Sequence, residues 1–365
     1  MNQFTPDNTK VAVIGGGNIG TQFACMVASK GYSVNIHTTK PSLFNETIEI
    51  VDENNLVTEG RLSVISSNIK EVITDCGIIF ITHPAFRLRT ISDMLLPYIN
   101  DGVMICVLPG TGGAEFAFKK CIDAGAVLCG LQRVPSVARL EEYGRRVRCE
   151  GVRSELHIAS IPQGQANDMA EFLTDIWGIP CCILPNYLSV TLTPSNPILH
   201  TTRIRTLFSD YHEGLIYETN PRFYGDWDTE SSDRLIKADR ELQEMCHMLR
   251  GINLESVKSL KLHYESDDKE AMTSKLRSIE SLNKLPSPMI KKDGGWIPDF
   301  NSRYFLADFP YGLAIIEELA EILGYTVPTI RDTMDWYIRV TGNNRCFSFE
   351  EYGIHTVDDL YEYYK

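Results

Sequence analysis

The chain has 365 residues, which is too long for one ordinary compact core and suits two domains. Hydrophobic residues make up 43% of it and charged residues 23%, a balance that is typical of globular proteins and excludes large-scale disorder. The net charge of −13 argues against nucleic acid and anionic membranes as partners, because both require a basic face. The sequence has no apolar run long enough for a membrane span and a polar start without a secretory signal, so we expect a cytoplasmic protein.

The ten cysteines do not form the C-x-x-C pairs that are typical of structural zinc sites. Many of them, such as Cys106 and the adjacent Cys181 and Cys182, lie in apolar, strand-like runs. In a cytosolic chain this pattern favours free thiols that pack as small hydrophobic side chains. We therefore expect no bound metal and no disulfide framework.

Residues 11–14 form an apolar run that leads directly into a G-x-G-x-x-G motif, and residues 21–30 can continue as a helix. Strand, glycine-rich turn and helix in this order are typical of a dinucleotide site, although the same turn can have a purely structural role. A second strand at residues 32–36 lies at the distance that a βαβ unit requires. The residues of the turn that we expect to contact the cofactor are Gly15, Gly17, Asn18, Ile19 and Gly20.

Further along the first half, short apolar runs alternate with helical stretches. The expected strands are residues 62–65, 76–82, 103–108, 126–131, 156–161 and 181–184, and the expected helices include residues 86–99, 113–124 and 164–177. Alternation of this kind predicts a parallel sheet that is covered on both faces. We predict a Rossmann-type, doubly wound dinucleotide-binding domain over residues 1–185.

Beyond residue 186 the strand-like runs almost vanish. Apolar residues recur at helical spacing in residues 233–249, 269–279, 311–323 and 329–340. The stretch 286–298 is rich in proline and glycine and is expected to be an irregular loop. The predicted fold class is thus α/β followed by an all-α catalytic and substrate domain over residues 186–365.

The end of the second strand bears on the choice of cofactor. NAD sites usually place a carboxylate there to bind the ribose hydroxyls, whereas this strand is followed by Thr38, Thr39 and Lys40. Two hydroxyls and a cation suit a 2′-phosphate, which favours NADP(H) over NAD(H). The alternative is that Lys40 is only a solvated loop lysine.

Two other loops follow strands and should face the cofactor, since open parallel sheets bind ligands at the carboxyl ends of their strands. His83 and Pro84 follow the strand at 76–82, and Thr111 follows the strand at 103–108. For His83 we favour a contact with the ribose, or none, over catalysis.

Several segments together resemble the opine dehydrogenases, the octopine/nopaline dehydrogenase family. They are the Rossmann half, the helical half, residues 196–200 (NPILH) and residues 302–313 (SRYFLADFPYGL), so the resemblance covers nearly the whole length. Members of that family join the amine of an amino acid to the carbonyl of a 2-oxo acid and reduce the imine with NAD(P)H. The resemblance thus implies a dehydrogenase acting on a CH–NH group, with an amino acid and a 2-oxo acid as its small-molecule partners.

The resemblance also implies catalytic roles. His200 would be the general acid/base, Asp308 would orient it, and Arg303 would hold a substrate carboxylate. Each role suits the residue type, since histidine exchanges protons near neutrality and the planar guanidinium binds both carboxylate oxygens. From the residues alone, His200 can equally be a satisfied core histidine, Asp308 a helix N-cap and Arg303 half of a surface ion pair.

The chain departs from the family pattern around the substrate. Ala307 stands where many relatives have a glutamate, and Thr111 stands where some have glutamine. Arg133 lies where relatives have a Thr-Leu-Pro turn, and it would add a cation for a second carboxylate if it faces the cleft. Asn196 shapes a turn or contacts the substrate. We include Thr111, Arg133 and Asn196 as candidate substrate-binding residues and leave the substrate's identity open.

Two other functions remain as alternatives. One is an NADPH-dependent 2-oxo acid reductase similar to ketopantoate reductase, whose catalytic residue is a lysine that has no counterpart in a matching context here. The other is a nucleotide-binding sensor without turnover, which would not need His200, Arg303 and Asp308. For assembly, we favour a homodimer only slightly over a monomer.

Overall fold

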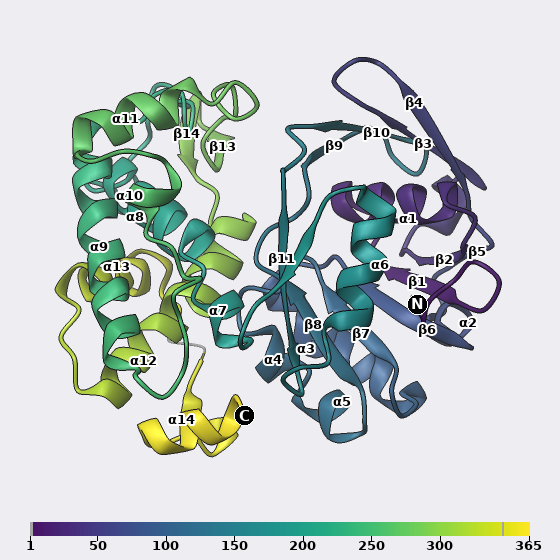
Figure 1. The fold of residues 1–365 in the computed structure, drawn as a ribbon. Helices are drawn as coiled ribbons and strands as arrows, with labels where there is room; N and C mark the ends of the chain where they lie inside the picture. Colours follow the sequence, from purple (N-terminus) through teal and green to yellow (C-terminus); the bar gives the residue numbers. More distant parts are fainter. Residues whose placement is uncertain (1–2, 345–346) are drawn as a thin grey trace. The chain divides into compact units, whose positions relative to one another are not determined.

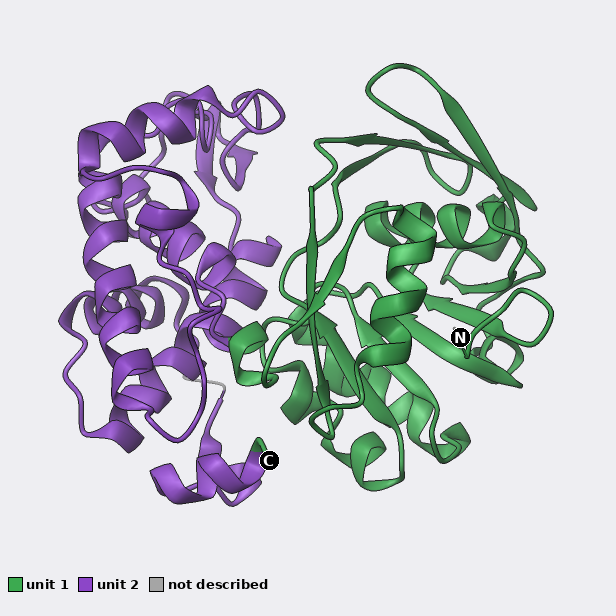
Figure 2. Cartoon of the chain, viewed as in Figure 1, with its two compact units in different colours: residues 1–191, 364–365 green, residues 192–363 purple. Residues whose placement is uncertain are grey.

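The computed structural model describes residues 3–344 and 347–365. The chain forms two compact units (Figure 2): residues 1–191 together with 364–365, and residues 192–363. The predicted domain boundary after residue 185 falls shortly before the point at which the first unit ends. Within the described ranges, no helix has both the length and the apolar character that a membrane crossing needs.

An eight-stranded sheet forms the centre of the first unit, in the order β12-β11-β8-β7-β6-β1-β2-β5. Neighbouring strands are parallel except for β8 and β11, which are antiparallel. The predicted Rossmann-type sheet is confirmed, with this one reversed strand pair. Its strands are β1 (Lys10–Ile14), β2 (Ser33–His37), β5 (Val64–Ser66), β6 (Cys76–Ile81), β7 (Met104–Val107), β8 (Val127–Leu131), β11 (Leu156–Ile161) and β12 (Cys181–Ile183).

Helices and short turns connect these strands (Figure 1). The helices of the first unit are α1 (Asn18–Ser29), α2 (Ile69–Ile73), α3 (Ala85–Leu95), α4 (Ala114–Ala117), α5 (Lys119–Asp123), α6 (Asn167–Trp177) and α7 (Leu188–Thr191). The 3₁₀ turns are η1 (Pro41–Leu43) and η2 (Leu96–Tyr98). The single helix expected over residues 113–124 is divided into α4 and α5.

A second sheet in the first unit was not predicted. It has four strands in the order β4-β3-β10-β9. They are β3 (Thr47–Val51), β4 (Val57–Arg61), β9 (Val137–Glu142) and β10 (Arg146–Glu150). Helix α1 contacts strands of both sheets, as Figure 1 also shows, so that nearly all of its circumference is buried.

One buried polar side chain of α1 bonds to residues at this second sheet. The buried Gln22 donates from Nε2 to Ser136 Oγ and Cys149 Sγ. A side chain at Gly60 on β4 would collide with the backbone of Cys25 on α1, since its Cβ would lie 2.4 Å from the carbonyl oxygen. Glycine there lets the strand lie directly on the helix.

The second unit is mainly helical, as predicted. Its helices are α8 (Thr201–Leu207), α9 (Thr229–Met248), α10 (Leu260–His263), α11 (Lys269–Ser278), α12 (Ala314–Leu323), α13 (Pro328–Thr341) and α14 (Val357–Tyr363). Two π-helical segments, η3 (Ser195–His200) and η4 (Tyr304–Leu313), lead into α8 and α12, and η5 (Phe349–Tyr352) is a 3₁₀ turn.

The prediction of an irregular loop at residues 286–298 is wrong in part. A two-stranded antiparallel hairpin forms there from β13 (Met289–Lys292) and β14 (Gly295–Pro298). Its turn contains Asp293 and Gly294, both with positive φ, which is the chemistry of a tight hairpin turn. The strongly turn-forming composition thus marked the centre of a hairpin.

Both points at which the chain passes between the units are bonded to one buried carboxyl group of the first unit. Thr191, the last residue before the second unit, donates from Oγ1 to Glu115 Oε1. Tyr364, the first residue after it, donates its hydroxyl to the same oxygen at 2.6 Å. Burial raises the pKa of Glu115 to about 7. Below that pH the carboxyl group is neutral, which suits its apolar surroundings.

This pKa predicts a pH dependence of stability. Between the unfolded value near 4.5 and the folded value near 7, the folded chain holds a proton that the unfolded chain lacks. The contribution to stability is therefore present at low pH and is lost as the pH rises through 7. Glu115→Gln keeps an acceptor oxygen and removes the titration. Its melting temperature should exceed that of wild type above pH 7, by an amount equivalent to about 1–3 kcal/mol.

The measurement is a series of thermal melts from pH 5 to pH 8. The exposed Glu171→Gln serves as the matched control and should follow the wild-type curve. Parallel curves for Glu115→Gln and wild type would contradict this role of burial.

Candidate active site

The glycine-rich turn of the first unit has the geometry of a phosphate-binding cradle. Gly15 has φ +121°, and a Cβ there would lie 2.6 Å from Thr82 Oγ1. A Cβ on Gly20 would lie 1.7 Å from the Gly15 carbonyl oxygen, so α1 can pack on the turn only with glycine at this position. At Gly17, in contrast, a Cβ would meet nothing within 4 Å. The turn is thus closed where the protein packs and open where a pyrophosphate would lie.

Helix α1 begins at Asn18, and no side chain caps its first turn. Its amino-terminal N–H groups are therefore available to an anion. The Asn18 side chain is directed elsewhere, because its Oδ1 accepts a hydrogen bond from the backbone N–H of Leu140 on β9 at 2.8 Å. Any contact of Asn18 with a phosphate is thus made by its backbone.

His83 lies directly beside this turn. Its ring would be 3.3 Å from a Cβ on Gly15, and its Nε2 is buried without a hydrogen-bond partner among the described residues. Burial lowers the pKa of His83 to about 4, and the charges of His37 and Arg87 act in the same direction. A neutral imidazole with an unused buried nitrogen suits a hydrogen bond to a ligand in the cradle. Pro84 follows as the N-cap residue of α3.

The residues after β2 divide into two kinds. Thr38 is buried, and its hydroxyl pairs with the Tyr143 hydroxyl at 2.7 Å and accepts from the Lys40 N–H at 3.2 Å. Thr39 and Lys40 are exposed, and the Lys40 ammonium lies over the Tyr143 ring, 5.7 Å from its centroid. Thr38 therefore supports the loop, while Thr39 and Lys40 present a hydroxyl and a cation to the solvent.

The sheet brings most predicted ligand-binding residues of the first unit to one edge. Strands β1, β2, β6, β7 and β8 are mutually parallel, so the loops after them lie at the same end of the sheet. The half-buried Thr111 and Arg133 are in the loops after β7 and β8, respectively. Asn196 is in η3 of the second unit and is also half-buried.

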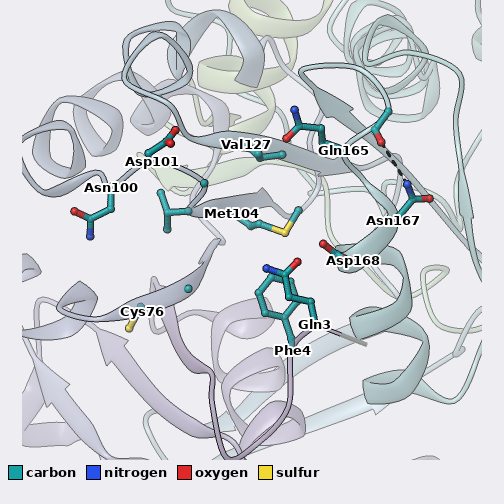
Figure 3. Close-up of a pocket in the computed structure, with 14 residues that line it drawn as sticks. Gln3, Phe4, Cys76, Asn100, Asp101, Met104, Val127, Gln165, Asn167 and Asp168 are labelled. Carbon is teal, nitrogen blue, oxygen red and sulfur yellow. Dashed lines mark hydrogen bonds between the residues drawn. The ribbon is translucent and has the colours of Figure 1, made fainter. Parts of the chain in front are cut away.

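A cavity of about 550 Å³ lies at the opposite end of these strands (Figure 3). Its lining includes Cys76, Met104 and Val127, which are at the beginnings of β6, β7 and β8, together with Asp101 and Asp168. Ligands of open parallel sheets bind at the carboxyl ends of the strands. We therefore do not assign the cofactor to this cavity, and none of the predicted site residues lines it.

In the second unit, the two π-helical segments bring His200 and Asp308 together. His200 Nδ1 lies 2.8 Å from Asp308 Oδ2, and the two residues are 4% and 9% exposed. Asp308 is in the interior of η4, so its alternative role as an N-cap at a helix start is wrong. A Cβ on Gly312 would be 3.0 Å from Pro197 Cγ, so glycine lets η4 lie close to η3.

The other ring nitrogen of His200 has a partner that sequence reasoning missed. His200 Nε2 lies 3.1 Å from the Tyr224 hydroxyl. Burial raises the pKa of Tyr224 well above that of a free phenol, so the hydroxyl keeps its proton. The imidazole is also enclosed by the rings of Tyr304 and Phe223, with centroids 4.8 and 5.7 Å away.

A buried arginine fixes the segment that carries Tyr224. Arg203 on α8 donates to the backbone oxygens of Phe223 and Asp226, at 3.2 and 2.8 Å. It also bonds Asp228 at 2.7 Å and Ser231 at 2.9 Å. These four bonds satisfy a 1% exposed guanidinium and hold residues 223–228 in place. The sequence around Arg203 does not predict that it holds this segment, because its partners are 20–28 positions away along the chain.

Arg303 comes directly before η4 and is exposed. Its guanidinium carbon lies 5.4 Å from the centroid of the Tyr304 ring, which in turn packs on His200. A cation over an aromatic face is held in orientation while its outer N–H groups remain accessible. Arg303 is thus near the imidazole and can contact a ligand from the solvent side.

Comparisons with known proteins agree with this geometry. Residues 183–341 match the NAD/NADP octopine/nopaline dehydrogenase α-helical domain, and residues 10–113 match the NAD-dependent glycerol-3-phosphate dehydrogenase N-terminus. Octopine dehydrogenase from Mizuhopecten yessoensis is 25% identical over 356 residues, which is 90% of this chain and 88% of that protein. Tauropine dehydrogenase from Arabella iricolor is 24% identical over 313 residues, which is 80% of this chain and 77% of that protein.

A solved structure has the same fold. Octopine dehydrogenase with NADH and L-arginine superimposes with a TM-score of 0.82 at 23% identity, over 96% of this chain and 97% of that one. The fold and the two matched domains define a two-domain dehydrogenase. The chain is thus an oxidoreductase that is similar to the octopine/nopaline dehydrogenases, and the predicted resemblance is confirmed.

Proposed function

We propose that this protein joins the amine of an amino acid to the carbonyl of a 2-oxo acid and reduces the resulting C–N double bond at the expense of NAD(P)H. The observation that carries the proposal is the buried His200, with Asp308 at one ring nitrogen and Tyr224 at the other. His200 lies in η3 and Asp308 in η4, and both residues belong to the segments that carry the resemblance to opine dehydrogenases. The named relatives act on opines, which supports the same class of reaction here.

The residues of the glycine-rich turn fit the cofactor. The open space at Gly17 and the uncapped start of α1 suit the pyrophosphate, and the unpartnered Nε2 of His83 suits a nearby hydroxyl. When bound, the reduced nicotinamide supplies a hydride to the substrate carbon. The reaction also needs a proton, which must reach the nitrogen next to that carbon.

His200 is the proton donor in this proposal. An ionised Asp308 only accepts hydrogen bonds, so His200 Nδ1 carries a hydrogen and donates it. In neutral His200 the lone pair on Nε2 then accepts from the Tyr224 hydroxyl, and in the imidazolium form Nε2–H donates to the Tyr224 oxygen. Asp308 thereby fixes the tautomer and stabilises the cation that forms between turnovers.

In this proposal Tyr224 relays the proton that leaves His200. Both nitrogens of the buried imidazole are engaged by protein groups, so a proton leaving Nε2 meets the Tyr224 oxygen first. The hydroxyl can receive this proton and release its own in the same direction. Arg303, held over Tyr304, provides the cation for a substrate carboxylate, and Thr111, Arg133 and Asn196 complete the proposed substrate contacts.

For the cofactor we propose a preference for NADP(H). The exposed Thr39 and Lys40 offer a hydroxyl and a cation at the end of β2, where a carboxylate would select NAD(H). Thr38 supports this loop through Tyr143 and does not need to contact the phosphate.

The reaction class is tested by following oxidation of NADPH and NADH with a panel of 2-oxo acids, each with and without a panel of amino acids. We expect a rate that requires both partners. His200→Asn should lower that rate by roughly two to four orders of magnitude, the usual contribution of a general acid, and leave cofactor affinity nearly unchanged. A rate with the oxo acid alone would instead identify a simple 2-oxo acid reductase, and cofactor binding without turnover would identify a sensor.

Tyr224→Phe tests the proton path. The rings are nearly the same size, so the aromatic packing remains while the bond to Nε2 is lost. We expect kcat to fall, by less than the ~10²–10⁴-fold loss for the acid itself, with little change in KM. The pH profile of kcat should also change in shape. A purely structural role would lower kcat equally at every pH, and unchanged kinetics would remove Tyr224 from the mechanism.

Lys40→Glu tests the cofactor preference. It replaces attraction to a 2′-phosphate by repulsion, so NADPH binding should weaken several-fold while NADH binding changes little, since an exposed charge pair is worth about 1 kcal/mol or less. The matched control is Lys30→Glu, an exposed lysine at the other end of α1. Equal responses of NADPH and NADH to Lys40→Glu in a fluorescence titration would refute the 2′-phosphate argument.

A further inference from the structure

Three side chains with metal-binding groups of different chemistry meet at an edge of the large sheet, and none of them is a predicted site residue. Glu155, His157 and Cys182 each offer one ligand atom, and the three atoms all lie within 4.8 Å of one another. Glu155 Oε1 and His157 Nε2 are 3.5 Å apart. This cluster has no part in the proposed reaction.

The strand register explains why these side chains converge. β12 is the edge strand and pairs in parallel with β11, with His157 opposite Cys182. Registered partners point to the same face of a sheet, and so do residues two apart along a strand. Glu155 lies directly before β11, and its carboxylate comes within 4.8 Å of the other two ligand atoms. Leu156 and Ile158 are directed to the other face and are buried in the core.

We propose that Glu155, His157 and Cys182 form a binding site for a divalent transition-metal ion, with Zn²⁺ as the best match. Imidazole nitrogen, thiolate sulfur and carboxylate oxygen are the three ligand types that Zn²⁺ combines in proteins. Three protein ligands leave a fourth tetrahedral position for water. The negative charges of a thiolate and a carboxylate neutralise the ion, and Cys182 loses its proton to the solvent when the metal binds.

The accessibility of the three residues agrees with such a site. Cys182 is exposed, and the His157 and Glu155 side chains are 28% and 49% exposed, so an ion can reach them from solvent. Among the described cysteines, the other eight are buried or partly buried. Cys181, the immediate neighbour, pairs in register with Leu156, so its side chain is directed to the other face of the sheet. The ion would link the three-residue strand β12 to β11.

The expectation of no metal rested on the absence of C-x-x-C pairs. Here His157 and Cys182 lie on two strands and are 25 positions apart along the chain, and Glu155 directly precedes the first of these strands. Only pairing of the strands brings them together, so the spacing along the chain gives no signal.

The test uses the full-length, tag-free protein, reduced and freed of metal with a chelator, and titrated with Co²⁺ as a spectroscopic probe. We expect saturable binding at a single site per chain, a thiolate-to-cobalt charge-transfer band, and loss of the band when Zn²⁺ is added. Cys182→Ser should abolish the band, and His157→Ala should abolish or strongly weaken it. Cys181→Ser is the matched control and should retain it.

Two further variants isolate the site. Cys346→Ser is titrated because Cys346 lies outside the described residues, and His200→Asn excludes binding at the candidate active site; both should retain the band. Thermal melts without metal verify that each variant folds. A band that survives Cys182→Ser, or wild type that shows none, would overturn the proposal. The readout is independent of turnover, so it stands or falls separately from the proposed reaction.

Discussion

The hydrogen bond between His200 Nδ1 and Asp308 Oδ2 is the constraint around which the second unit is arranged. It joins two segments that are both π-helical, and neither residue is more than 9% exposed. Pro310 in η4 has no N–H to donate, so a regular α-helical ladder is interrupted at this segment. Widened turns of this kind occur frequently at functional sites. The irregular backbone and the buried hydrogen-bonded pair are thus two aspects of one site.

The surroundings of this pair decide what the imidazole can do. Tyr224 occupies Nε2, Tyr304 and Phe223 cover the ring, and Arg203 fixes the backbone that carries Tyr224. In such an environment a hydrogen bond is stronger than in water, and an unpaired polar atom is more costly. The tautomer of His200 is therefore determined by its partners.

The sequence allowed prediction of residues in recognisable local motifs. It did not allow prediction of residues that come together only when distant segments fold. The turn from Gly15 to Gly20 could be predicted because packing requires glycine at Gly15 and Gly20, while Gly17 leaves space for a ligand. The loops after β6, β7 and β8 could be placed because parallel strands end at one edge. His200 and Asp308 came from the resemblance, since nothing local joins residues 108 positions apart. Tyr224 and the sheet around α1 depend on contacts between distant short segments, which periodicity does not reveal.

The carboxyl group of Glu115 shows how the first unit fixes its own boundaries. The chain leaves this unit after Thr191 and returns to it at Tyr364, and both side chains donate to the same oxygen. An ionised carboxylate at a fully buried position is unfavourable, and burial accordingly raises its pKa to about 7. The hydrogen bonds from Thr191 and Tyr364 partly offset that cost. They also hold the two residues that flank the second unit's segment of the chain. A single buried acid thus holds both residues at which the chain passes to and from the second unit.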